Sequence, residues 1–370
     1  MKKETKQTNN CKPEIQNALA ILRKKFGEEA AMTFNSAKKI AVDVVSTGSL
    51  GVDLALGIGG IPLGRISEIY GPESSGKSTI CIQICAEAQK KGYNVAYIDL
   101  EHSLDPTYMR SLGCDLDNMI ISQPSCGEDA FNIATTLLEN KLVNVIIFDS
   151  VAAMLTRAEI TGEVGDMYIG RQAKLMSDGL KKITPLASRA NCACVFVNQI
   201  RDKIGVMFGS PETTSGGNAL KFYASVRMRI SRTTKPIEEH DEAIGNDTHL
   251  KVIKNKLAPP FRETDFKIFY GEGVSKVSEI LDHGVKYGLI GKSGSFYRYD
   301  GATIGQGELK ALAWLKSQPE VQETLLEQMK AKMLDEEVVP EEEDEIKAEV
   351  EIKDESLQEE NQETTTEAEN

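Results

Sequence analysis

The 370-residue sequence lacks the features of a membrane or secreted protein. No stretch approaches 18 uncharged apolar residues, which is about the shortest run that reads as a membrane-spanning helix. Residues 1–11 are polar and contain no apolar h-region, so we expect no secretory signal. The chain also lacks an internal repeat. These absences predict a cytoplasmic protein without a membrane partner.

The cysteines lack the spacing of a metal site or of a disulfide framework. There are seven, an odd number, and none has C-x-x-C spacing or a pair of histidines nearby. Cys81 and Cys85 fall on the apolar side of an expected helix, and Cys192 and Cys194 lie in or beside an apolar strand. We therefore expect reduced thiols and no zinc site.

Excess basic charge is missing from the chain as a whole, whose formal net charge is −13. Residues 335–370 contain 17 acidic residues and two lysines, a net −15, so the rest of the chain carries about +2. This last segment has no apolar periodicity and is predicted to be a disordered acidic tail. The remaining chain is free to carry basic patches for nucleic acid.

The chain does contain the pattern of a phosphate-binding loop. Ile66–Tyr70 reads as a buried strand, Gly71–Ser78 fits G-x-x-x-x-G-K-[ST], and a helix pattern starts at Ile80. Backbone N–H groups and the helix N-terminus would face phosphates, Lys77 would place its charge on the outer phosphates, and Ser78 would bind Mg²⁺. A glycine-rich turn that only connects two elements is the weaker interpretation.

Strands and helices alternate beyond this loop. The expected elements are helix Ile80–Lys91, strands Val95–Asp99 and Ile120–Ser122, helix Gly127–Asn140, strand Val143–Asp149, helix Arg171–Ala190, strand Cys192–Asn198, and the shorter strands Phe222–Ser231, Leu250–Lys254 and Phe266–Phe269. The pattern predicts an α/β fold with a mostly parallel central sheet and helices on both faces.

The two ends of the chain differ from this middle. Pro13–Phe26 is predicted to be an amphipathic helix that Gly27 ends, with one apolar face formed by Ile15, Leu19, Leu22 and Phe26. That face could pack on the chain's own core or on a neighbour. A small α/β unit is expected near the other end, with the only tryptophan, Trp314, and a helix near Val321–Leu334.

Two carboxylates follow strand patterns. Asp149 ends an apolar strand, where a second magnesium contact is expected beside the phosphate loop. Glu101 follows the strand Val95–Asp99 and could polarise a water for in-line attack on a γ-phosphate. Taken alone, Asp149 could be an ordinary strand end and Glu101 a solvated loop acid.

Two glycine-punctuated loops are candidates for binding single-stranded nucleic acid. Asn198-Gln199 ends the strand before one of these loops. An amide at that position can contact a γ-phosphate and swing away when the γ-phosphate is absent.

Gly205–Ala219 is this loop candidate, with four glycines, many hydroxyls and the single aromatic Phe208. Glu159–Gly170, with Tyr168 and Ile169, is the second candidate. A flexible lid over a nucleotide is the alternative for both.

Two lysines could complete an anion site. Lys254 and Lys256 alternate on a strand and therefore point the same way. A solvated strand edge is the alternative.

Several long strings resemble the bacterial RecA recombinase family. They are GPESSGKST, IDLEHSLDP, VIIFDSVAA, NQIR, KIGVMFGSPETTSGGNALKFYASVR, KNK and FYGEG, in the family's order. The resemblance covers about Phe26 to Leu334. It implies a RecA-like P-loop NTPase that forms a helical filament on single-stranded DNA, pairs it with homologous double-stranded DNA and exchanges strands while hydrolysing ATP. It also implies activation of self-cleavage in an SOS repressor of the LexA type.

The resemblance also implies residues of a nucleotide site. ATP and Mg²⁺ would be bound by Gly71, Pro72, Glu73, Ser74, Ser75, Gly76, Lys77, Ser78 and Thr79, with Ser78 and Asp149 at the metal and Ser150 supporting it. Catalytic roles would fall to Glu101 as base, Lys77, and Gln199 as γ-phosphate sensor. The adenine would be met by Asp105, Tyr108 and Tyr270. Lys254 and Lys256 would reach the ATP of the neighbouring subunit.

The two glycine-punctuated loops resemble the family's DNA-binding loops. The residues that would contact DNA are Ile169, Gly170, Ser177, Lys181, Arg201, Lys203, Phe208, Thr213, Gly216, Gly217 and Asn218. Arg232 and Lys251 match a weaker second DNA site, and the N-terminal helix would dock on the adjacent subunit. The sequence departs from the commoner family residues at Met167, Tyr168, Ile169, Lys174, Lys181 and His249; lysine in place of arginine keeps the charge but loses the bidentate fork.

The resemblance implies four parts of the chain. They are an N-terminal helix and oligomerisation segment at 1–38, an ATPase core at 39–275, a small C-terminal domain at 276–334 and the acidic tail at 335–370. Two other classes are less well matched. A ring-forming helicase or phosphoryl-transfer ATPase would not need the loop Gly205–Ala219 or the N-terminal helix, and a structural filament or regulatory binder would not need Glu101.

Overall fold

The computed structural model describes residues 12–27, 31, 42–163, 168, 170–202, 212–239 and 241–337. Their contacts divide the chain into two units, Met1–Asp43 and Val44–Asn370. Among the described residues, none of the helices has the length and apolar character needed to cross a membrane.

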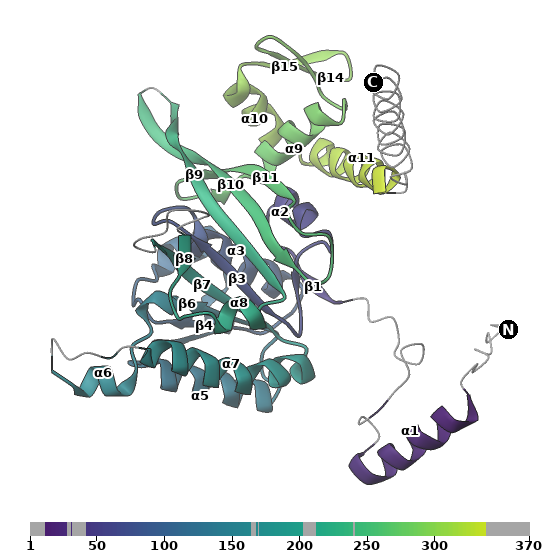
Figure 1. Cartoon of the computed structure of the whole chain (residues 1–370). Helices are drawn as coiled ribbons and strands as arrows, with labels where there is room; N and C mark the ends of the chain where they lie inside the picture. The colour runs from purple at the N-terminus through teal and green to yellow at the C-terminus, as the bar shows by residue number, and fades with distance from the viewer. Residues whose placement is uncertain are drawn as a thin grey trace, which may run out of the picture. The chain divides into compact units, whose positions relative to one another are not determined.

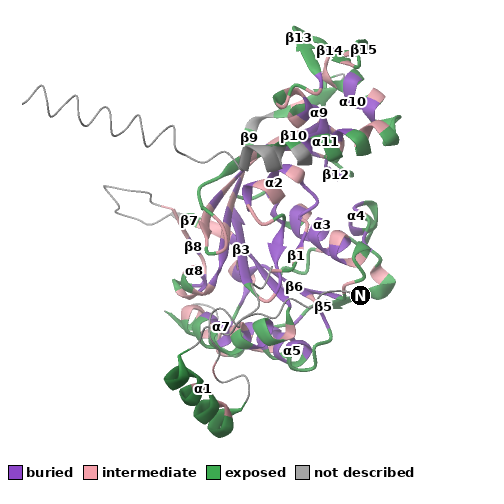
Figure 2. Ribbon diagram, turned by 90° about the vertical axis from the view of Figure 1, so that its right-hand side faces the viewer, coloured by how far each residue is buried: buried purple, intermediate pink, exposed green. Residues whose placement is uncertain are grey.

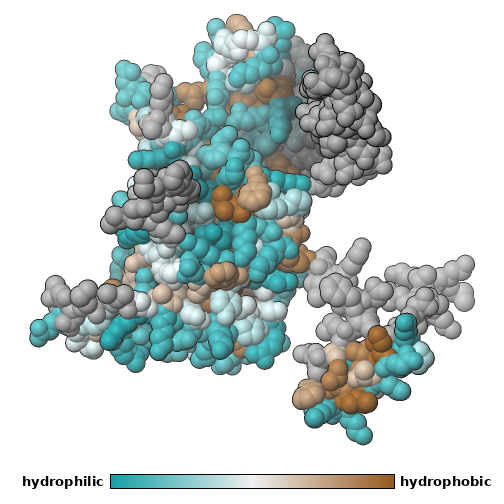
Figure 3. All heavy atoms as spheres, in the orientation of Figure 1, coloured by the Kyte–Doolittle hydropathy of each residue, from teal (hydrophilic) through white to brown (hydrophobic). Residues whose placement is uncertain are grey.

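The described part of the first unit is one helix, α1 (Pro13–Phe26), as predicted. Proline at the first helical position and Gly27, at φ 100°, mark its two ends. None of its residues is buried, and Ile15, Leu22 and Phe26 are all exposed. Figure 3 shows the hydrophobic side chains gathered on this helix.

The second unit has one large sheet, helices on both of its faces and a small C-terminal domain (Figure 1). Its elements in chain order are β1 (Val44–Val45), α2 (Leu50–Ala55), β2 (Ile61–Pro62), β3 (Ile66–Gly71), α3 (Lys77–Lys90), β4 (Val95–Asp99), α4 (Pro106–Ser111), η2 (Leu116–Asn118), β5 (Met119–Ser122), α5 (Gly127–Glu139), β6 (Val145–Asp149), η3 (Val151–Ala153), α6 (Arg157–Thr161), α7 (Arg171–Ala190), β7 (Ala193–Asp202), β8 (Glu212–Thr214), α8 (Ala219–Tyr223), β9 (Val226–Glu239), β10 (Glu242–Asn255), β11 (Glu263–Phe269), β12 (Gly273–Val274), α9 (Lys276–Lys286), β13 (Gly291–Ser293), β14 (Phe296–Tyr299), β15 (Ala302–Gln306), α10 (Glu308–Lys316) and α11 (Pro319–Glu337).

The strand order of the large sheet is β12-β11-β10-β9-β3-β7-β6-β4-β5, with β8 paired to β7. Strands β9 through β5 in this order run parallel, and β9 to β12 are antiparallel. This arrangement confirms the predicted mostly parallel α/β fold. The parallel strands end on one edge, where open α/β sheets bind their ligands.

The central strands are buried on both faces, as their continuous apolar runs predict. Every residue of β3, β4 and β6 is buried (Figure 2). One face packs against α3 and the other against α5 and α7. On the second face the rings of Phe148 and Phe196 stack with centroids 4.3 Å apart. The sheet is therefore a rigid platform for the residues at its edge.

Several predicted boundaries were wrong. The strand predicted to end at Asn198 continues to Asp202, because β8 returns beside its end. The strand predicted from Phe222 starts at Val226, since α8 turns the preceding residues against α7. Strands β9 and β10 also extend past the predicted ones as a long hairpin whose outer residues are mostly polar, so no regular apolar alternation marks them (Figure 1). Helix α11 extends to Glu337, three residues into the predicted tail; residues 338–370 lie outside the described residues.

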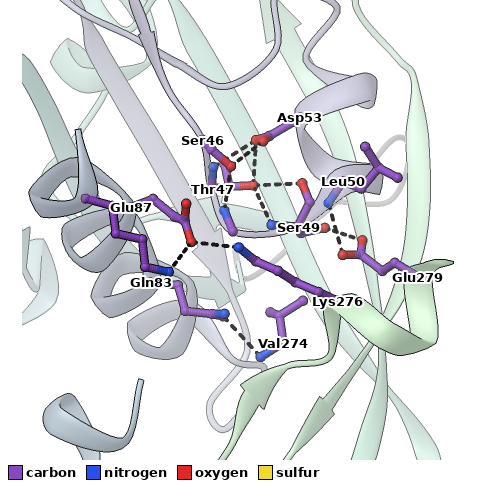
Figure 4. A network of polar contacts seen from close by, with 12 residues as sticks. Ser46, Thr47, Ser49, Leu50, Asp53, Gln83, Glu87, Val274, Lys276 and Glu279 are labelled. Atoms are coloured by element: carbon purple, nitrogen blue, oxygen red, sulfur yellow. Dashed lines mark hydrogen bonds and ion pairs between the residues drawn. The ribbon is translucent and has the colours of Figure 1, made fainter. Parts of the chain in front are cut away.

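The C-terminal domain has a core of its own and is joined to the large-sheet domain by hydrogen bonds (Figure 4). Buried Glu279 of α9 accepts hydrogen bonds at the N-terminus of α2, from Ser49 Oγ at 2.6 Å and from the backbone N–H groups of Leu50 at 3.0 Å and Gly51 at 2.9 Å. Burial raises the pKa of Glu279 to about 7. Farther along the same interface, Lys276 pairs with Glu87 of α3 at 2.8 Å.

Candidate functional site

A loop joins β3 to α3, which confirms the predicted order of strand, loop and helix, although α3 starts at Lys77 and not at the predicted Ile80. Gly76 has φ 91°, and a Cβ there would come within 2.4 Å of the Ile268 side chain. A Cβ on Gly71 would lie 2.0 Å from the Ile230 carbonyl oxygen. Both positions therefore require glycine. Lys77 Nζ lies inside the loop and donates to the carbonyl oxygens of Gly71 at 3.2 Å and Pro72 at 2.6 Å.

Asp149 at the end of β6 lies beside the first turn of α3. Its Oδ2 accepts hydrogen bonds from Ser78 Oγ at 2.9 Å and from the Tyr97 hydroxyl at 2.6 Å. Burial raises the pKa of Asp149, and these two donors oppose that rise. Burial also lowers the pKa of Lys77, which Asp149 and Glu101 oppose. A hydroxyl and a carboxylate side by side are the oxygen donors that Mg²⁺ prefers, so these residues fit the predicted ion.

Tyr97 is a residue of this site that the sequence did not reveal. It lies within an apolar strand and is fully buried, so its pattern is that of an ordinary core residue. Only its pairing across the sheet brings its hydroxyl to Asp149.

Glu101 follows β4 and contacts residues at the ends of the two next strands in the sheet, β6 and β7. Its Oε1 accepts a hydrogen bond from Ser150 Oγ, which follows β6, and lies 3.4 Å from Gln199 Nε2 on β7. The backbone N–H of Glu101 donates to the Asp149 carbonyl oxygen. The predicted base, sensor and metal-site residues therefore lie together beside the phosphate loop, with the Glu101 side chain open to solvent.

The predicted adenine contacts fall in two places. Tyr108 of α4 reaches the phosphate loop, with its hydroxyl 3.0 Å from Thr79 Oγ1. Asp105 caps the same helix by accepting from the Thr107 N–H at 2.8 Å. The Tyr270 ring is exposed, and its hydroxyl accepts from Asn246 Nδ2 at 2.8 Å. Of these three residues, Tyr108 alone has a hydrogen bond to the loop among the described contacts.

Lys254 and Lys256 point the same way, as alternation predicts. Lys254 Nζ donates to the carbonyl oxygens of Lys221 at 2.6 Å and Phe222 at 3.2 Å, and Lys256 Nζ lies 3.4 Å from the second of these. Both amines therefore contact the C-terminal end of α8 rather than the phosphate loop. Phe222 beside them is 74% exposed, which is unusual for a phenylalanine.

The described part of the first candidate loop ends at the start of α7. Gly170 caps this helix at φ 75°, and the Arg171 guanidinium lies 4.8 Å from the Tyr168 ring centroid. Ser177 and Lys181 are exposed four residues apart on α7. Met167 and Ile169 lie outside the described residues.

The described residues on either side of the second loop pair as the antiparallel strands β7 and β8. Arg201 on β7 pairs with Thr213 on β8, so both predicted contacts lie on strands rather than in an irregular loop. Gly216 and Gly217 follow at φ 82° and 74°, and a Cβ on either would lie 2.8 Å from the Val151 or Ala173 side chain. Asn218 then starts α8. Lys203 and Phe208 lie outside the described residues.

The roots of the two loops meet at α7. The glycines of the second loop pack against Ala173 of α7 and against η3, which directly follows Ser150. Gln172 Nε2 donates to the carbonyl oxygens of Val151 at 2.8 Å and Met154 at 3.1 Å. The loop roots are thus tied to the strand that carries Asp149.

The sequence did not reveal the side chains that anchor the second loop. Arg229 on β9 makes a bidentate pair with Glu212, with N–O distances of 2.9 and 2.7 Å. Lys221 Nζ donates to Thr213 Oγ1 at 3.0 Å. These partners are separated by 17 and 8 residues and show no local pattern.

The residues predicted for a second DNA site lie on the β9–β10 hairpin. Lys251 pairs with Glu263 at 3.0 Å, and His249 Nδ1 lies 2.8 Å from Asp265 Oδ1. Arg232 is exposed on β9. Carboxylates on β11 thus partly balance the basic charge of this surface.

Comparisons with known proteins match nearly the whole described chain. Residues 13–275 match the family model of the RecA N-terminal domain, and residues 278–334 match that of the RecA C-terminal domain. The protein RecA of Teredinibacter turnerae is 50% identical over 325 residues, which cover 88% of this chain and 95% of the relative. The protein RecA of Zymomonas mobilis is 53% identical over 311 residues, covering 84% of this chain and 88% of the relative.

Two further matches complete the comparison. The protein RecA of Pseudomonas putida is 51% identical over 326 residues, covering 88% of this chain and 92% of the relative. Among solved structures, the RadB recombinase matches at 20% identity with a TM-score of 0.48, covering 62% of this chain and 98% of that chain.

Proposed function

The chain belongs to the RecA family, and from that membership we propose that it is an ATP-dependent DNA recombinase. It forms a helical filament on single-stranded DNA, pairs that strand with homologous double-stranded DNA and exchanges strands. ATP hydrolysis releases the filament from its DNA-binding state. The domain division at residues 1–38, 39–275, 276–334 and 335–370 is part of this proposal.

The phosphate loop holds ATP in this proposal. Its backbone N–H groups face the phosphates, and Lys77 turns from the Gly71 and Pro72 carbonyl oxygens toward the outer phosphates. Ser78 and Asp149 would hold Mg²⁺, which when bound neutralises charge on the phosphate oxygens. Tyr97 keeps the Asp149 carboxylate oriented toward Ser78.

Glu101 acts as the general base on the attacking water. Its carboxylate is exposed to solvent and is oriented by the Ser150 hydroxyl, so it can accept a proton from a water on its open side. Gln199 lies beside it and would contact the γ-phosphate.

The partners of the proposed filament are DNA and further copies of the chain. Single-stranded DNA would contact α7 and the two loop roots, and double-stranded DNA would contact the hairpin that carries Lys251. The exposed apolar face of α1 and the amines of Lys254 and Lys256 would contact neighbouring subunits. The assembled filament would activate self-cleavage of an SOS repressor of the LexA type.

The contact between Gln199 and Glu101 is the observation that carries the proposal. It places the strand leading into the second loop against the group that would activate water. DNA bound at the loop can therefore change the hydrolytic site. We expect slow ATP hydrolysis without DNA and a sharp rise with single-stranded DNA, measured by phosphate release. An equal rate with and without single-stranded DNA would refute the recombinase proposal.

A further inference from the structure

Glu68 is a carboxylate at the centre of the sheet with no exposed surface. It lies on β3, between β7 and β9. Its neighbour Ile69 packs with α3, whereas Ile66 packs with α5 and α7, so alternation places Glu68 on the face away from the phosphate-loop helix. A carboxylate in such a place is tolerated only when charged and hydrogen-bonding partners surround it.

Both oxygens of Glu68 are occupied by fixed partners. Arg227, directly opposite on β9, donates from Nε to Oε2 at 2.5 Å. The guanidinium also lies 4.8 Å from the Tyr70 ring centroid. Asn198 on β7 donates from Nδ2 to Oε1 at 2.9 Å. Glu68 therefore links the strand on each side of it.

Asn198 continues this link to the root of the second loop. Its Nδ2 also donates to the Ser215 carbonyl oxygen at 3.1 Å, and its Oδ1 accepts from the Gln199 N–H at 2.9 Å. Two acceptors thus face the amide nitrogen and one donor faces the oxygen, so only one orientation of the amide satisfies them all. Glu68 is one of the two acceptors that fix it.

Gln199 points to the other side of the same strand. Because side chains alternate along β7, Asn198 faces Glu68 while Gln199 faces Glu101. A displacement of the β7 backbone at Gln199 therefore also moves Asn198 and its contact with Ser215. The buried Thr214 hydroxyl beside this contact has no hydrogen-bond partner among the described residues. A second arrangement of the loop root could give the Thr214 hydroxyl a hydrogen-bond partner, and this gain would help to stabilise that second arrangement.

Building on the proposed function, we propose that Glu68 is a positioning residue for nucleotide-dependent DNA binding. It holds Asn198 so that a displacement of Gln199 at the phosphate site moves Ser215 at the root of the second loop. The same carboxylate holds Arg227, which lies opposite Lys254 in the β9–β10 register.

The substitution Glu68→Gln tests this role. Glutamine offers one acceptor oxygen and one NH₂ group, so it cannot accept from both Arg227 and Asn198. Because the charged guanidinium is the stronger donor, the oxygen faces Arg227 and the hydrogen bond from Asn198 is lost. The readout is the ratio of Kd for single-stranded DNA with ADP to that with a nonhydrolysable ATP analogue. We expect the variant to reduce this ratio at least about fivefold. Glu87→Gln, which removes an acid paired with Lys276 elsewhere, should keep the wild-type ratio.

A second variant, Asn198→Ala, leaves the pair of Glu68 and Arg227 intact and removes the hydrogen bonds of the Asn198 side chain to Glu68, to the Ser215 carbonyl oxygen and from the Gln199 N–H. It should reduce the ratio by a similar factor, and the double variant should lose no more than either single one. The inference is overturned if folded Glu68→Gln keeps the wild-type ratio, or if the two losses add. If Glu68→Gln does not fold, Asn198→Ala alone decides. A wild-type ratio of one would instead refute the proposed function.

Discussion

The phosphate site and the roots of the two loops are held in different ways. At the phosphate site the proposed functional side chains contact one another, as Ser78 does Asp149 and Gln199 does Glu101. At the loop roots each anchor is a separate pair between distant segments, such as Glu212 with Arg229. Groups that act as a unit fail together, whereas separate anchors change a property in steps. Single substitutions should therefore have much larger effects at the first region.

The largest effect is expected for Glu101→Gln. Removing the proposed base while keeping the shape of the side chain should lower kcat by about 10²–10⁴-fold. Nucleotide binding should remain, because the phosphate loop is untouched. The measurements are ATP hydrolysis with single-stranded DNA and equilibrium binding of a fluorescent ATP analogue. A rate within threefold of wild type would remove Glu101 from the chemistry.

Lys77→Ala should come next. Loss of the ammonium group from the loop should lower hydrolysis by about 10²–10³-fold, since it would stabilise charge developing on the phosphates. Lys90→Ala, at the exposed end of the same helix, is the matched control and should hydrolyse ATP normally. Circular dichroism checks that both variants are folded. Retained hydrolysis in folded Lys77→Ala would contradict the proposed site.

The third prediction concerns the stability of the contact between the C-terminal domain and α2. Among the described contacts, the buried Glu279 carboxylate there has neutral hydrogen-bond donors and no cation. Its pKa is raised from 4.5 to about 7 by burial, so the folded state binds a proton that the unfolded state has lost. The stabilisation of the folded state by protonated Glu279 is complete below pH 4.5 and is lost as the pH rises through about 7. Between pH 5.5 and 8 the contribution is about 2 kcal/mol.

Urea unfolding at pH 5.5 and at pH 8 measures this change in the free energy of unfolding. Asp53 contributes in the same direction, because burial raises its pKa to about 6. The comparison with Glu279→Gln isolates the Glu279 part, since glutamine does not titrate. The wild type should lose about 2 kcal/mol more than the variant on going to pH 8. An identical loss in both would show that Glu279 does not titrate in this range.

The acidic tail should have a smaller effect, of about tenfold, on binding of double-stranded DNA at low salt. Its carboxylates compete with DNA phosphates for the basic body of the chain. Because α11 ends at Glu337, deletion of residues 338–370 removes the tail and spares the helix. The gain in affinity should shrink as salt is raised. No gain at low salt would exclude competition by the tail.

The smallest effect is expected at α7. Lys181→Ala should weaken binding of single-stranded DNA by about threefold and reduce the salt slope by about 0.7, as for loss of one phosphate contact. Arg189→Ala, an exposed cation at the other end of α7, should leave both quantities unchanged. An equal effect of the two variants would indicate nonspecific attraction rather than contact at the loop roots.

The same contrast explains what could be predicted from the sequence. The phosphate loop and the strand ends at Asp149 and Glu101 were visible because strand, glycine and helix signals are local, and parallel strands end on one edge. Tyr97 was missed because a buried tyrosine looks like core. The anchors of the second loop, including Glu212 with Arg229, depend on pairing between distant segments. No local pattern marks such pairs.

The misplaced boundaries have a related cause. Strand β7 continues to Asp202 only because β8 pairs with its polar end, and α8 includes Phe222 and Tyr223, which have strand preference, because it packs on α7. Tertiary contacts override local propensity in both places. Burial at the centre of a sheet likewise gave no sequence signal for Glu68, which stands among apolar residues of β3.

The central claim is that nucleotide and DNA bind to this chain as coupled ligands, and reciprocal binding measures it most directly. Kd for single-stranded DNA is measured with ADP and with a nonhydrolysable ATP analogue, and Kd for each nucleotide is measured with and without DNA. The account predicts that DNA favours the ATP analogue over ADP by the same factor, at least fivefold, by which the analogue strengthens DNA binding. A factor of one in both directions would contradict it.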